Sequence, residues 1–281
     1  MLVFSGSKIN LGLNVLESRN DGFHNIETIF YPLRWNDALE VLENTDNQVV
    51  KMSFSGHSII GSESDNIIVK AYDLVKKNYS VPGVKVHLHK NIPMGAGLGG
   101  GSSNASCFIN LLDAKFDLKI PLAKKLEFAK QLGSDCAFFI ENTPVFAKEK
   151  GDVFESVKID LSSYYILVVY PNVHSNTKMA YQGITPKKPN ESVKTIIETR
   201  SIDDWKTLLV NDFEDSVFKN LPQIKNMKQR FYDSGALYSS MSGSGSAVFG
   251  IFKNRPELNF DKDFLHFLQI PKNVIKSEYQ L

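Results

Sequence analysis

A glycine-rich loop at residues 95–101 has the composition that most strongly indicates chemistry. Five of its seven residues are glycine, and Ser102, Ser103 and Asn104 lead from it into an apolar, helix-periodic run. Backbone without Cβ atoms can bring its N–H groups close to a ligand. A helix that begins directly afterwards adds unpaired donors and a positive dipole end. The combination predicts a site for an anion, with nucleotide phosphates as the best candidate. A flexible linker is the alternative.

Two standard phosphate motifs match the loop only in part. The pattern Gly95-x-Gly97-x-x-Gly100 satisfies the dinucleotide fingerprint. A Rossmann unit also needs a second strand that ends in an acid about twenty residues further on, and Lys115–Pro121 does not provide one. The same glycines have the spacing of a Walker loop, but Gly101 stands where its lysine should be. A phosphate bound here must therefore rely on backbone N–H groups and the helix dipole, with cations supplied from elsewhere.

Two charged residues outside the loop are candidates for catalysis. Lys8 lies on the polar face of an alternating strand pattern, although a solvated lysine fits that pattern as well. Asp135 follows Gly133, which ends a predicted helix, and precedes the apolar run 137–140. Its carboxylate could therefore lie in a partly dry cleft, or it could belong to a local turn or cap. From local pattern alone, His24 is either a core histidine or a binding residue, and Phe23 is either plain packing or a binding residue.

The composition is that of an ordinary globular protein. Of the 281 residues, 42% are hydrophobic and 22% are charged, and the length is sufficient for two domains or two lobes. The net charge of +1 gives no overall field for nucleic acid or an anionic membrane. Cys107 and Cys136 form no CxxC or Cys/His cluster, which favours buried packing and a reducing, cytoplasmic environment. The N-terminal residues do not resemble a signal peptide.

The predicted elements place the loop between β-rich and helical segments. Strands are expected over residues 2–15, 26–33, 38–42, 49–54 and 84–89. Helices are expected up to Tyr79 after an N-cap offered by Ser64-Asp65-Asn66, after the loop, and over 121–133. In the second half, strands are expected over 164–170, 237–241 and 247–252, and helices over 205–213, 222–231 and near 261–269. We therefore predict an α+β protein with an N-terminal lobe over residues 1–155 and a C-terminal lobe over 156–281.

Five segments occur in an order that resembles the GHMP kinase superfamily. They are Lys8-Ile9-Asn10-Leu11, Asp21-Gly22-Phe23-His24, Pro93 to Ala105, Gly133-Ser134-Asp135 and Ser242-Gly243-Ser244-Gly245. The resemblance runs nearly end to end, and Asn211-Asp212-Phe213-Glu214 also fits it. The glycine loop indicates only the superfamily. The first two segments resemble the branch that phosphorylates a cytidine diphosphate-linked polyol in the non-mevalonate isoprenoid pathway.

The resemblance implies the fold and the nucleotide. The fold would be two-lobed and α+β, with the active site in the cleft between lobes. The N-terminal lobe would bind ATP, and Mg²⁺ would screen the phosphate charge, with Ser103 near the metal. The residues implied in ATP binding are Asn66, Pro93, Met94, Gly95, Ala96, Gly97, Leu98, Gly99, Gly100, Gly101, Ser102, Ser103 and Asn104.

The resemblance also implies roles in the reaction and in acceptor binding. Asp135 would accept the proton of the acceptor's C2 hydroxyl, and Lys8 would orient Asp135 and stabilise charge on the transferring phosphoryl group. Whether Asp135 is a true base or a hydroxyl positioner stays open. The acceptor would be a cytidine diphosphate-linked methylerythritol. Its implied binding residues are Asn10 for the sugar-like part, Phe23 and Tyr181 for stacking on cytosine, and His24 for the edge of the base.

The chain departs from the family pattern at a few positions. Phe23 stands where tyrosine is usual, which keeps a stacking ring, and Cys136 replaces a commoner aliphatic residue. Glu149 stands where glycine is usual and Asp152 where glutamate is usual.

One rival function is a GHMP kinase for another small alcohol, such as a mevalonate-pathway intermediate, homoserine or a sugar. The other is a non-catalytic nucleotide-binding protein of the same fold, which would not need both Lys8 and Asp135.

Overall fold

The computed structural model describes residues 1–44, 49–59, 62 and 65–274. Helices and strands are both abundant, which confirms the α+β class. The chain divides into two compact units, each built from separate segments. Unit 1 comprises Met1–Lys8, Pro32–Met94 and Gly99–Thr143, and unit 2 comprises Ile9–Tyr31, Gly95–Leu98 and Pro144–Leu281. Two pieces of the predicted N-terminal lobe, 9–31 and 95–98, thus cluster with the later part of the chain.

Unit 1 contains a sheet built around the second half of a long strand. Strands β1 (Leu2–Ser18) and β2 (His24–Glu43) contribute to both units. In unit 1, β2 pairs antiparallel with β4 (Val84–Lys90), and β3 (Val50–Gly56) pairs parallel with β4. Separate strands at 26–33 and 38–42 were expected, but β2 is continuous. Leu33, Trp35 and Asp37 are buried in alternation, so the two-residue period runs through the predicted break.

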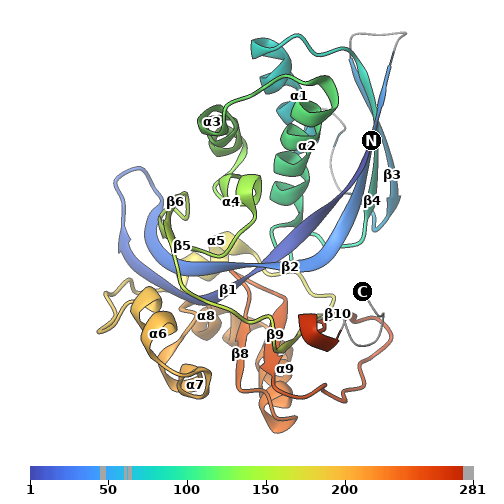
Figure 1. Cartoon of the computed structure of the whole chain (residues 1–281). Helices are drawn as coiled ribbons and strands as arrows, with labels where there is room; N and C mark the ends of the chain where they lie inside the picture. The colour runs from blue at the N-terminus through green and yellow to red at the C-terminus, as the bar shows by residue number, and fades with distance from the viewer. Residues whose placement is uncertain (45–48, 60–61, 63–64, 275–281) are drawn as a thin grey trace. The chain divides into compact units, whose positions relative to one another are not determined.

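Four helices complete unit 1, and Figure 1 shows them as one group. They are α1 (Ile67–Asn78), α2 (Gly100–Phe116), α3 (Leu122–Leu132) and α4 (Cys136–Glu141). Within the segment 64–66 that was predicted to cap α1, Asn66 is the cap, because its Oδ1 accepts a hydrogen bond from the Ile68 N–H at 2.9 Å. Helix α2 buries the apolar face of the predicted helix, and its first residues, Gly100 and Gly101, are the last two of the glycine loop. The phosphate-loop candidate therefore leads into a helix that is fixed by packing.

Unit 2 contains the first half of β2 and a second sheet. Strand β2 pairs antiparallel with β5 (Val145–Glu149), which pairs with β6 (Val153–Ser156). The second sheet is antiparallel, in the order β10-β7-β9-β8, with β7 at Tyr165–Tyr170, β8 at Tyr238–Met241, β9 at Val248–Phe252 and β10 at Leu265–Gln269. The predicted helix near 261–269 is wrong: this segment forms β10 because it pairs with the free edge of β7.

The helices of unit 2 lie along the second half of the chain. They are α5 (Thr177–Gln182), α6 (Val193–Thr199), the 3₁₀ turn η2 (Ile202–Asp204), α7 (Trp205–Leu208), α8 (Phe213–Asn220) and α9 (Pro222–Asp233). The single helix predicted over 205–213 is wrong, because the chain between α7 and α8 is extended. There the Leu13 N–H donates to the Val210 carbonyl at 2.8 Å, and the Asp212 N–H donates to the Leu13 carbonyl at 2.9 Å. Pairing with β1 thus replaces helical hydrogen bonds.

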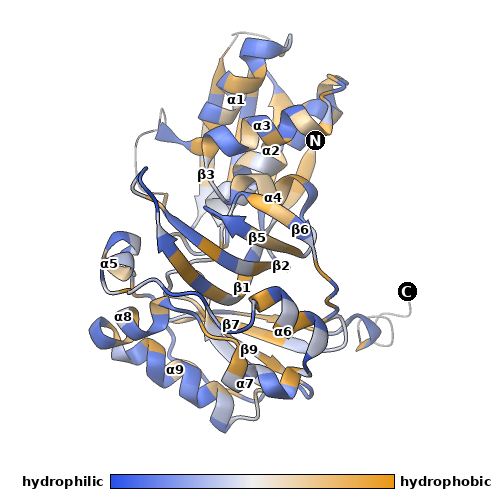
Figure 2. Cartoon of the chain, turned by 90° about the vertical axis from the view of Figure 1, so that its left-hand side faces the viewer, coloured by the Kyte–Doolittle hydropathy of each residue, from blue (hydrophilic) through white to orange (hydrophobic). Residues whose placement is uncertain are grey.

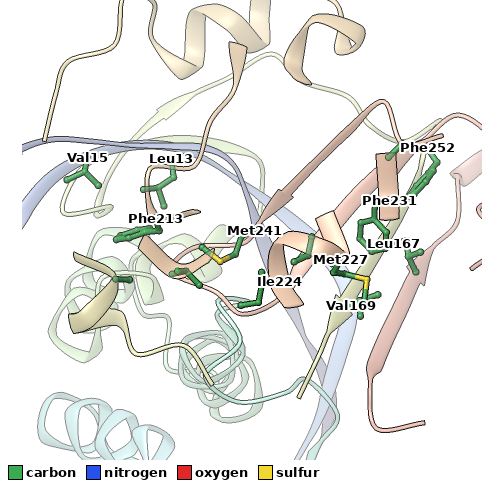
Figure 3. Packing of buried hydrophobic residues seen from close by; sticks show 14 of the residues in the cluster. Leu13, Val15, Leu167, Val169, Phe213, Ile224, Met227, Phe231, Met241 and Phe252 are labelled. Atoms are coloured by element: carbon green, nitrogen blue, oxygen red, sulfur yellow. The ribbon is translucent and has the colours of Figure 1, made fainter. Parts of the chain in front are cut away.

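A hydrophobic core fixes α8 and α9 in unit 2. Both helices show polar and apolar bands in Figure 2, as expected of helices with one buried face. Figure 3 shows the side chains that meet in this core, which come from β1, the second sheet and both helices: Leu13, Val15, Leu167, Val169, Phe213, Ile224, Met227, Phe231, Met241 and Phe252. The packing holds the residues just before α8 at a defined place beside β1 and β8.

Candidate active site

The glycine loop has a backbone that alternates between left-handed glycines and buried side chains. Gly95, Gly97 and Gly99 have φ values of +65°, +80° and +71°, a region that side-chain-bearing residues rarely adopt. Ala96 and Leu98, between them, are buried. Successive N–H groups in such an arrangement form a concave surface that binds anions. This backbone geometry is compatible with the phosphate site that the sequence predicts.

The glycines of the loop differ in what surrounds them. A Cβ atom on Gly97 would lie 2.0 Å from the Ser242 carbonyl oxygen, whereas a Cβ on Gly101 would meet nothing within 4 Å. Gly97 is therefore required by close packing, and Gly101, in the first turn of α2, borders open space. The N-cap residue of α2 is Gly99, which has no side chain to cap the helix. The first N–H groups of a helix without such a cap can bind a ligand or solvent.

The serine–glycine segment at 242–245 lies directly against this loop. The Ser242 Oγ donates to the Gly97 carbonyl at 2.9 Å, and the Ala247 N–H donates to the Ala96 carbonyl at 3.0 Å. All four residues belong to unit 2. Two glycine-rich segments that are far apart in sequence thus form one packed arrangement, and the first depends on the second for its backbone partners.

Lys8 and Asp135 meet within unit 1. The Lys8 Nζ lies 3.5 Å from the Asp135 Oδ2, with the lysine side chain 4% exposed and the aspartate side chain 30% exposed. Burial lowers the pKa of Lys8, and the neighbouring Asp135 partly offsets this. The Lys8 stem packs beside the end of the glycine loop, because a Cβ on Gly99 would lie 3.2 Å from its Cγ. The solvated-lysine alternative is therefore wrong.

Asp135 directly precedes α4, but its carboxylate makes no capping hydrogen bond to that helix. The neighbouring Cys136 is buried, and burial raises the pKa of its thiol to about 11. Burial likewise raises the pKa of Cys107 to about 11. Both thiols are therefore packing residues, and the partly exposed Asp135 carboxylate can accept a proton or orient a hydroxyl.

The other residues predicted for the nucleotide divide between exposed and structural positions. Met94 is exposed, and Pro93 and Ser103 are buried. Asn66 uses its Oδ1 to cap α1. Asn104 is buried, and its amide donates to the Ser5 Oγ at 2.7 Å and the Asp37 Oδ2 at 2.8 Å. The Asn104 side chain therefore supports the start of α2 from inside unit 1.

A buried ion pair beneath this region was missed by sequence reasoning. The Lys90 Nζ contacts the Asp37 Oδ2, and both side chains are almost fully buried. The Asp37 Oδ1 accepts hydrogen bonds from the N–H groups of Asn91 and Ile92, each at 2.8 Å. Burial lowers the pKa of Lys90. The pair fixes the backbone that leads into the loop. The sequence signal that could have revealed this ion pair is the aspartate at an inward position of the alternating strand β2.

Two of the predicted acceptor-binding residues meet in unit 2. The rings of His24 and Tyr181 are stacked, with centroids 4.6 Å apart and an interplanar angle of 18°. Phe23 is 58% exposed, and the Lys150 Nζ lies 5.2 Å from its ring centroid. Asn10 is buried and donates to the Thr28 Oγ1 at 3.1 Å. The exposed Phe23 ring, which precedes His24 directly in the chain, is a suitable surface for a planar base.

The departure at Glu149 has a structural consequence. Its φ of +56° lies in the left-handed region, which glycine adopts without strain. Its carboxylate pairs with Arg19 at 3.7 Å, so the side chain that costs conformational strain also makes an ion pair. The Asp152 Oδ1 is buried with no hydrogen-bond partner among the described residues. This turn therefore combines a left-handed non-glycine residue, an ion pair and a buried carboxylate oxygen.

Comparison with known proteins gives matches along most of the chain. The model of the GHMP kinases N terminal domain matches residues 66–142, and that of the GHMP kinases C terminal domain matches residues 193–267. A protein of Cytophaga hutchinsonii, named 4-diphosphocytidyl-2-C-methyl-D-erythritol kinase, is 47% identical over 92% of this chain and 94% of its own length. A Bacteroides fragilis protein of the same name is 46% identical over 90% of this chain and 92% of its own length.

A solved structure agrees with these sequence matches. It is described as 4-(cytidine 5'-diphospho)-2C-methyl-D-erythritol kinase, and it superposes with a TM-score of 0.75 at 29% identity, over 89% of this chain and 90% of its own. Within the part of the chain that the structure describes, no helix is both long and apolar enough to span a membrane. The two domain matches and the identity to relatives confirm the resemblance: this chain belongs to the GHMP kinase family and is a small-molecule kinase.

Proposed function

We propose that this chain transfers the γ-phosphoryl group of ATP to the C2 hydroxyl of 4-diphosphocytidyl-2-C-methyl-D-erythritol. The observation that carries the proposal is the Lys8–Asp135 pair, a buried cation beside a partly exposed carboxylate at 3.5 Å. Such a pair suits phosphoryl transfer, in which a carboxylate positions the attacking hydroxyl and a cation stabilises the transferring group. A protein that only binds nucleotide needs no such carboxylate. The acceptor is taken from the printed name that relatives at 46–47% identity share. We also propose that the protein is cytoplasmic. Its two lobes are proposed to comprise residues 1–155 and 156–281.

In the proposed reaction, the chain supplies positioning and charge. Phosphoryl transfer requires little covalent chemistry from the protein, so one carboxylate, one cation and a donor-rich loop are sufficient. Asp135 would accept or orient the proton of the acceptor hydroxyl. Lys8 would hold the Asp135 carboxylate in place and stabilise negative charge on the transferring group. The N–H groups of the glycine loop and of the first turn of α2 would bind the phosphates.

The residues present are compatible with a magnesium ion that is held largely by the nucleotide. Across the described residues, no group of three His, Cys, Asp or Glu side chains could hold a metal ion alone. Magnesium usually keeps several waters and binds substrate phosphates with few protein ligands. The Ser103 hydroxyl, in the first turn of α2, is the protein ligand that we propose. The ion would neutralise charge on the phosphates.

The acceptor would be recognised by its cytosine. The Phe23 ring is exposed and therefore available for stacking, and stacking on an aromatic ring contributes about 1–3 kcal/mol per base. Tyr181 is the candidate for the second face, and His24 for a hydrogen bond to the edge of the base. Asn10 is proposed to contact the sugar-like part of the acceptor.

A panel of acceptors tests this function directly. Purified protein would be incubated with Mg·ATP and with each acceptor separately, and ADP release would be measured. We expect turnover with the cytidylated methylerythritol and none with mevalonate, homoserine or galactose. Turnover of an uncytidylated acceptor, beside none of the cytidylated one, would assign the chain to another branch of the family. Nucleotide binding without turnover of any acceptor would support the non-catalytic alternative.

A further inference from the structure

The four residues Asn211–Glu214, here called the linking segment, make contacts that have no assigned role in the proposed reaction. They lie between α7 and the first turn of α8, and the whole segment belongs to unit 2. The Asp212 Oδ2 accepts a hydrogen bond from the Val15 N–H at 2.7 Å. Together with the backbone bonds to Leu13, this attaches the segment to β1. It is therefore a fixed point from which its other side chains can position their neighbours.

Asn211 directs its amide at the serine–glycine segment 242–245. Its Nδ2 donates to the carbonyls of Met241 and Gly243, each at 2.8 Å, and its Oδ1 accepts from the Phe213 N–H at 3.0 Å. The side chain is almost fully buried. Because Ser242 lies between the two carbonyls and donates to Gly97, the contacts run without a gap from Asn211 to the glycine loop.

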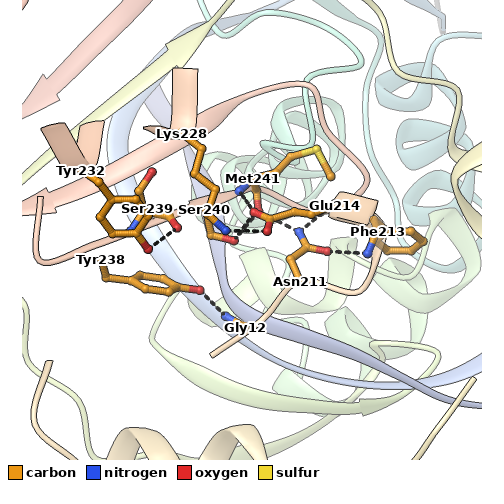
Figure 4. Close-up of polar contacts among 11 residues, drawn as sticks. Gly12, Asn211, Phe213, Glu214, Lys228, Tyr232, Tyr238, Ser239, Ser240 and Met241 are labelled. Carbon is orange, nitrogen blue, oxygen red and sulfur yellow. Dashed lines mark hydrogen bonds and ion pairs between the residues drawn. The ribbon is translucent and has the colours of Figure 1, made fainter. Parts of the chain in front are cut away.

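Glu214 fixes the strand that enters the same segment. Its Oε1 accepts from the Ser240 Oγ at 3.0 Å and from the Met241 N–H at 2.9 Å, and its Oε2 pairs with Lys228 at 2.6 Å. Figure 4 shows the Asn211 amide and the Glu214 carboxylate pointing toward the same end of β8 from one side. The end of β8 is therefore held by two buried side chains of the linking segment.

Phe213 points toward the aromatic residues proposed for the acceptor. Its ring meets the edge of Tyr181 at a centroid distance of 4.7 Å and an interplanar angle of 89°. Tyr181 in turn stacks on His24. Such ring pairs fix relative orientation, since edge-to-face and stacked contacts are directional. A second path of contacts thus runs from the same segment to His24.

We infer that the linking segment positions both substrates' binding residues, Asn211 acting on the nucleotide loop and Phe213 on the acceptor's aromatic residues. The inference rests on the proposed function, because it takes the glycine loop as the nucleotide site and His24 with Tyr181 as part of the acceptor site. Asn211 and Phe213 are positioning residues that act through Ser242 and Tyr181. The two residues are adjacent in the fold, but their effects on the two substrates are separable.

The test for Asn211 removes its donor and measures each substrate separately. In Asn211→Asp the Oδ1 acceptor for Phe213 is retained, but the donor to two carbonyls is lost. We expect the KM for ATP and the Kd for ADP to rise about tenfold or more, the usual result of losing buried hydrogen bonds, while the KM for the acceptor stays within about twofold. Ser242→Ala, a smaller change that removes only the bond to Gly97, should raise the same two constants.

The test for Phe213 uses the opposite readout. Phe213→Leu keeps an apolar side chain in the core but removes the ring edge on Tyr181. We expect the KM for the acceptor to rise about fivefold, with the KM for ATP and the Kd for ADP unchanged.

Phe218→Leu is the matched control for Phe213→Leu, because Phe218 lies on the same helix and packs on the same core. Asn220→Ala is the control for Asn211, because its amide bonds only within α8 to Ser216. Neither control should change the KM for ATP, the Kd for ADP or the KM for the acceptor.

The outcomes separate this inference from the proposed function. Wild-type protein that fails to turn over the cytidylated acceptor contradicts the proposed function. If the wild type does turn over this acceptor, two results overturn the inference and leave only a structural role for the segment. In the first, each variant changes the constants for ATP and ADP and the KM for the acceptor together. In the second, the control variants change these constants as much as the test variants do. Unchanged ADP binding in both Asn211→Asp and Ser242→Ala overturns it as well.

Discussion

The Lys8 ammonium lies 3.5 Å from the Asp135 carboxylate, although one residue belongs to the first strand and the other precedes the fourth helix. The lysine is buried and the aspartate is partly exposed, so the pair has one side toward the protein and one toward solvent. In this arrangement the cation can hold the carboxylate in place while the carboxylate meets a substrate.

Asp135→Asn should lower kcat by about 10²–10⁴, the usual contribution of general acid–base catalysis. The amide keeps the shape of the side chain but cannot accept the proton of the hydroxyl, so ADP should still bind with its normal Kd. Steady-state kinetics and direct nucleotide binding measure the two effects. Asp73→Asn, at an exposed position of α1, is the control that should behave as wild type. A near-normal kcat in Asp135→Asn would place the base elsewhere.

The pH profile should reveal the lowered pKa of Lys8. Because burial lowers this pKa, the charged lysine is lost at a pH below the ordinary value of about 10.5, and kcat/KM should fall there. In the same window the unfolded state binds more protons than the native state, so this group makes stability rise with pH. Lys8→Met should remove the alkaline limb along with most of the activity. A fall in activity that tracks unfolding would contradict the assignment.

Gly101→Ala should increase stability and weaken ATP binding. Alanine is more favourable than glycine within a helix by about 0.5–1 kcal/mol, and a Cβ here meets no protein atom within 4 Å. The methyl group would stand in the open space where phosphates are proposed to lie. Denaturant unfolding and the KM for ATP give the two readouts. Gly97→Ala should instead destabilise the fold, because its Cβ would lie 2.0 Å from the Ser242 carbonyl oxygen. An unchanged KM in Gly101→Ala would argue against phosphates at this turn.

Phe23→Ala should raise the KM for the cytidylated acceptor by about tenfold or more, since a stacked base contributes about 1–3 kcal/mol. The KM for ATP should not change. Phe23→Tyr is the matched variant, because it keeps the ring and restores the residue that is usual in the family. It should bind the acceptor at least as well as wild type. Equal effects of Phe23→Ala on both substrates would indicate a role in folding rather than in stacking.

Asp37→Asn should lower the free energy of unfolding by about 3–5 kcal/mol, because it leaves the buried Lys90 charge without its partner. Urea unfolding measures the change. Glu127→Gln breaks the ion pair of Glu127 with Lys124 on the surface of α3, and this should cost at most about 1 kcal/mol. Similar losses in the two variants would mean that Lys90 is accommodated as a neutral amine.

The regular periodicities predicted most of the elements, and the exceptions share a cause. A capped start of α1, the helix after the glycine loop and strands β4, β7, β8 and β9 were predicted because local pattern and tertiary structure agree there. The segment 265–269 forms a strand because β7 offers an edge to pair with. The chain before Phe213 is extended because β1 supplies its backbone partners. In both places a distant strand decided the local conformation.

The sequence by itself determined the chemistry of the glycine loop, the family and the residue types at the proposed site, because these depend on side-chain identity and spacing along the chain. Tertiary structure alone decided that Lys8, which the resemblance pairs with Asp135, is buried. It alone decided that Asp37 and Lys90 support the entry to the loop and that Asn211 reaches Gly97 through Ser242. Each of these contacts joins residues far apart in sequence. No local pattern encodes such contacts, since they exist only when the packed core brings the separate segments together.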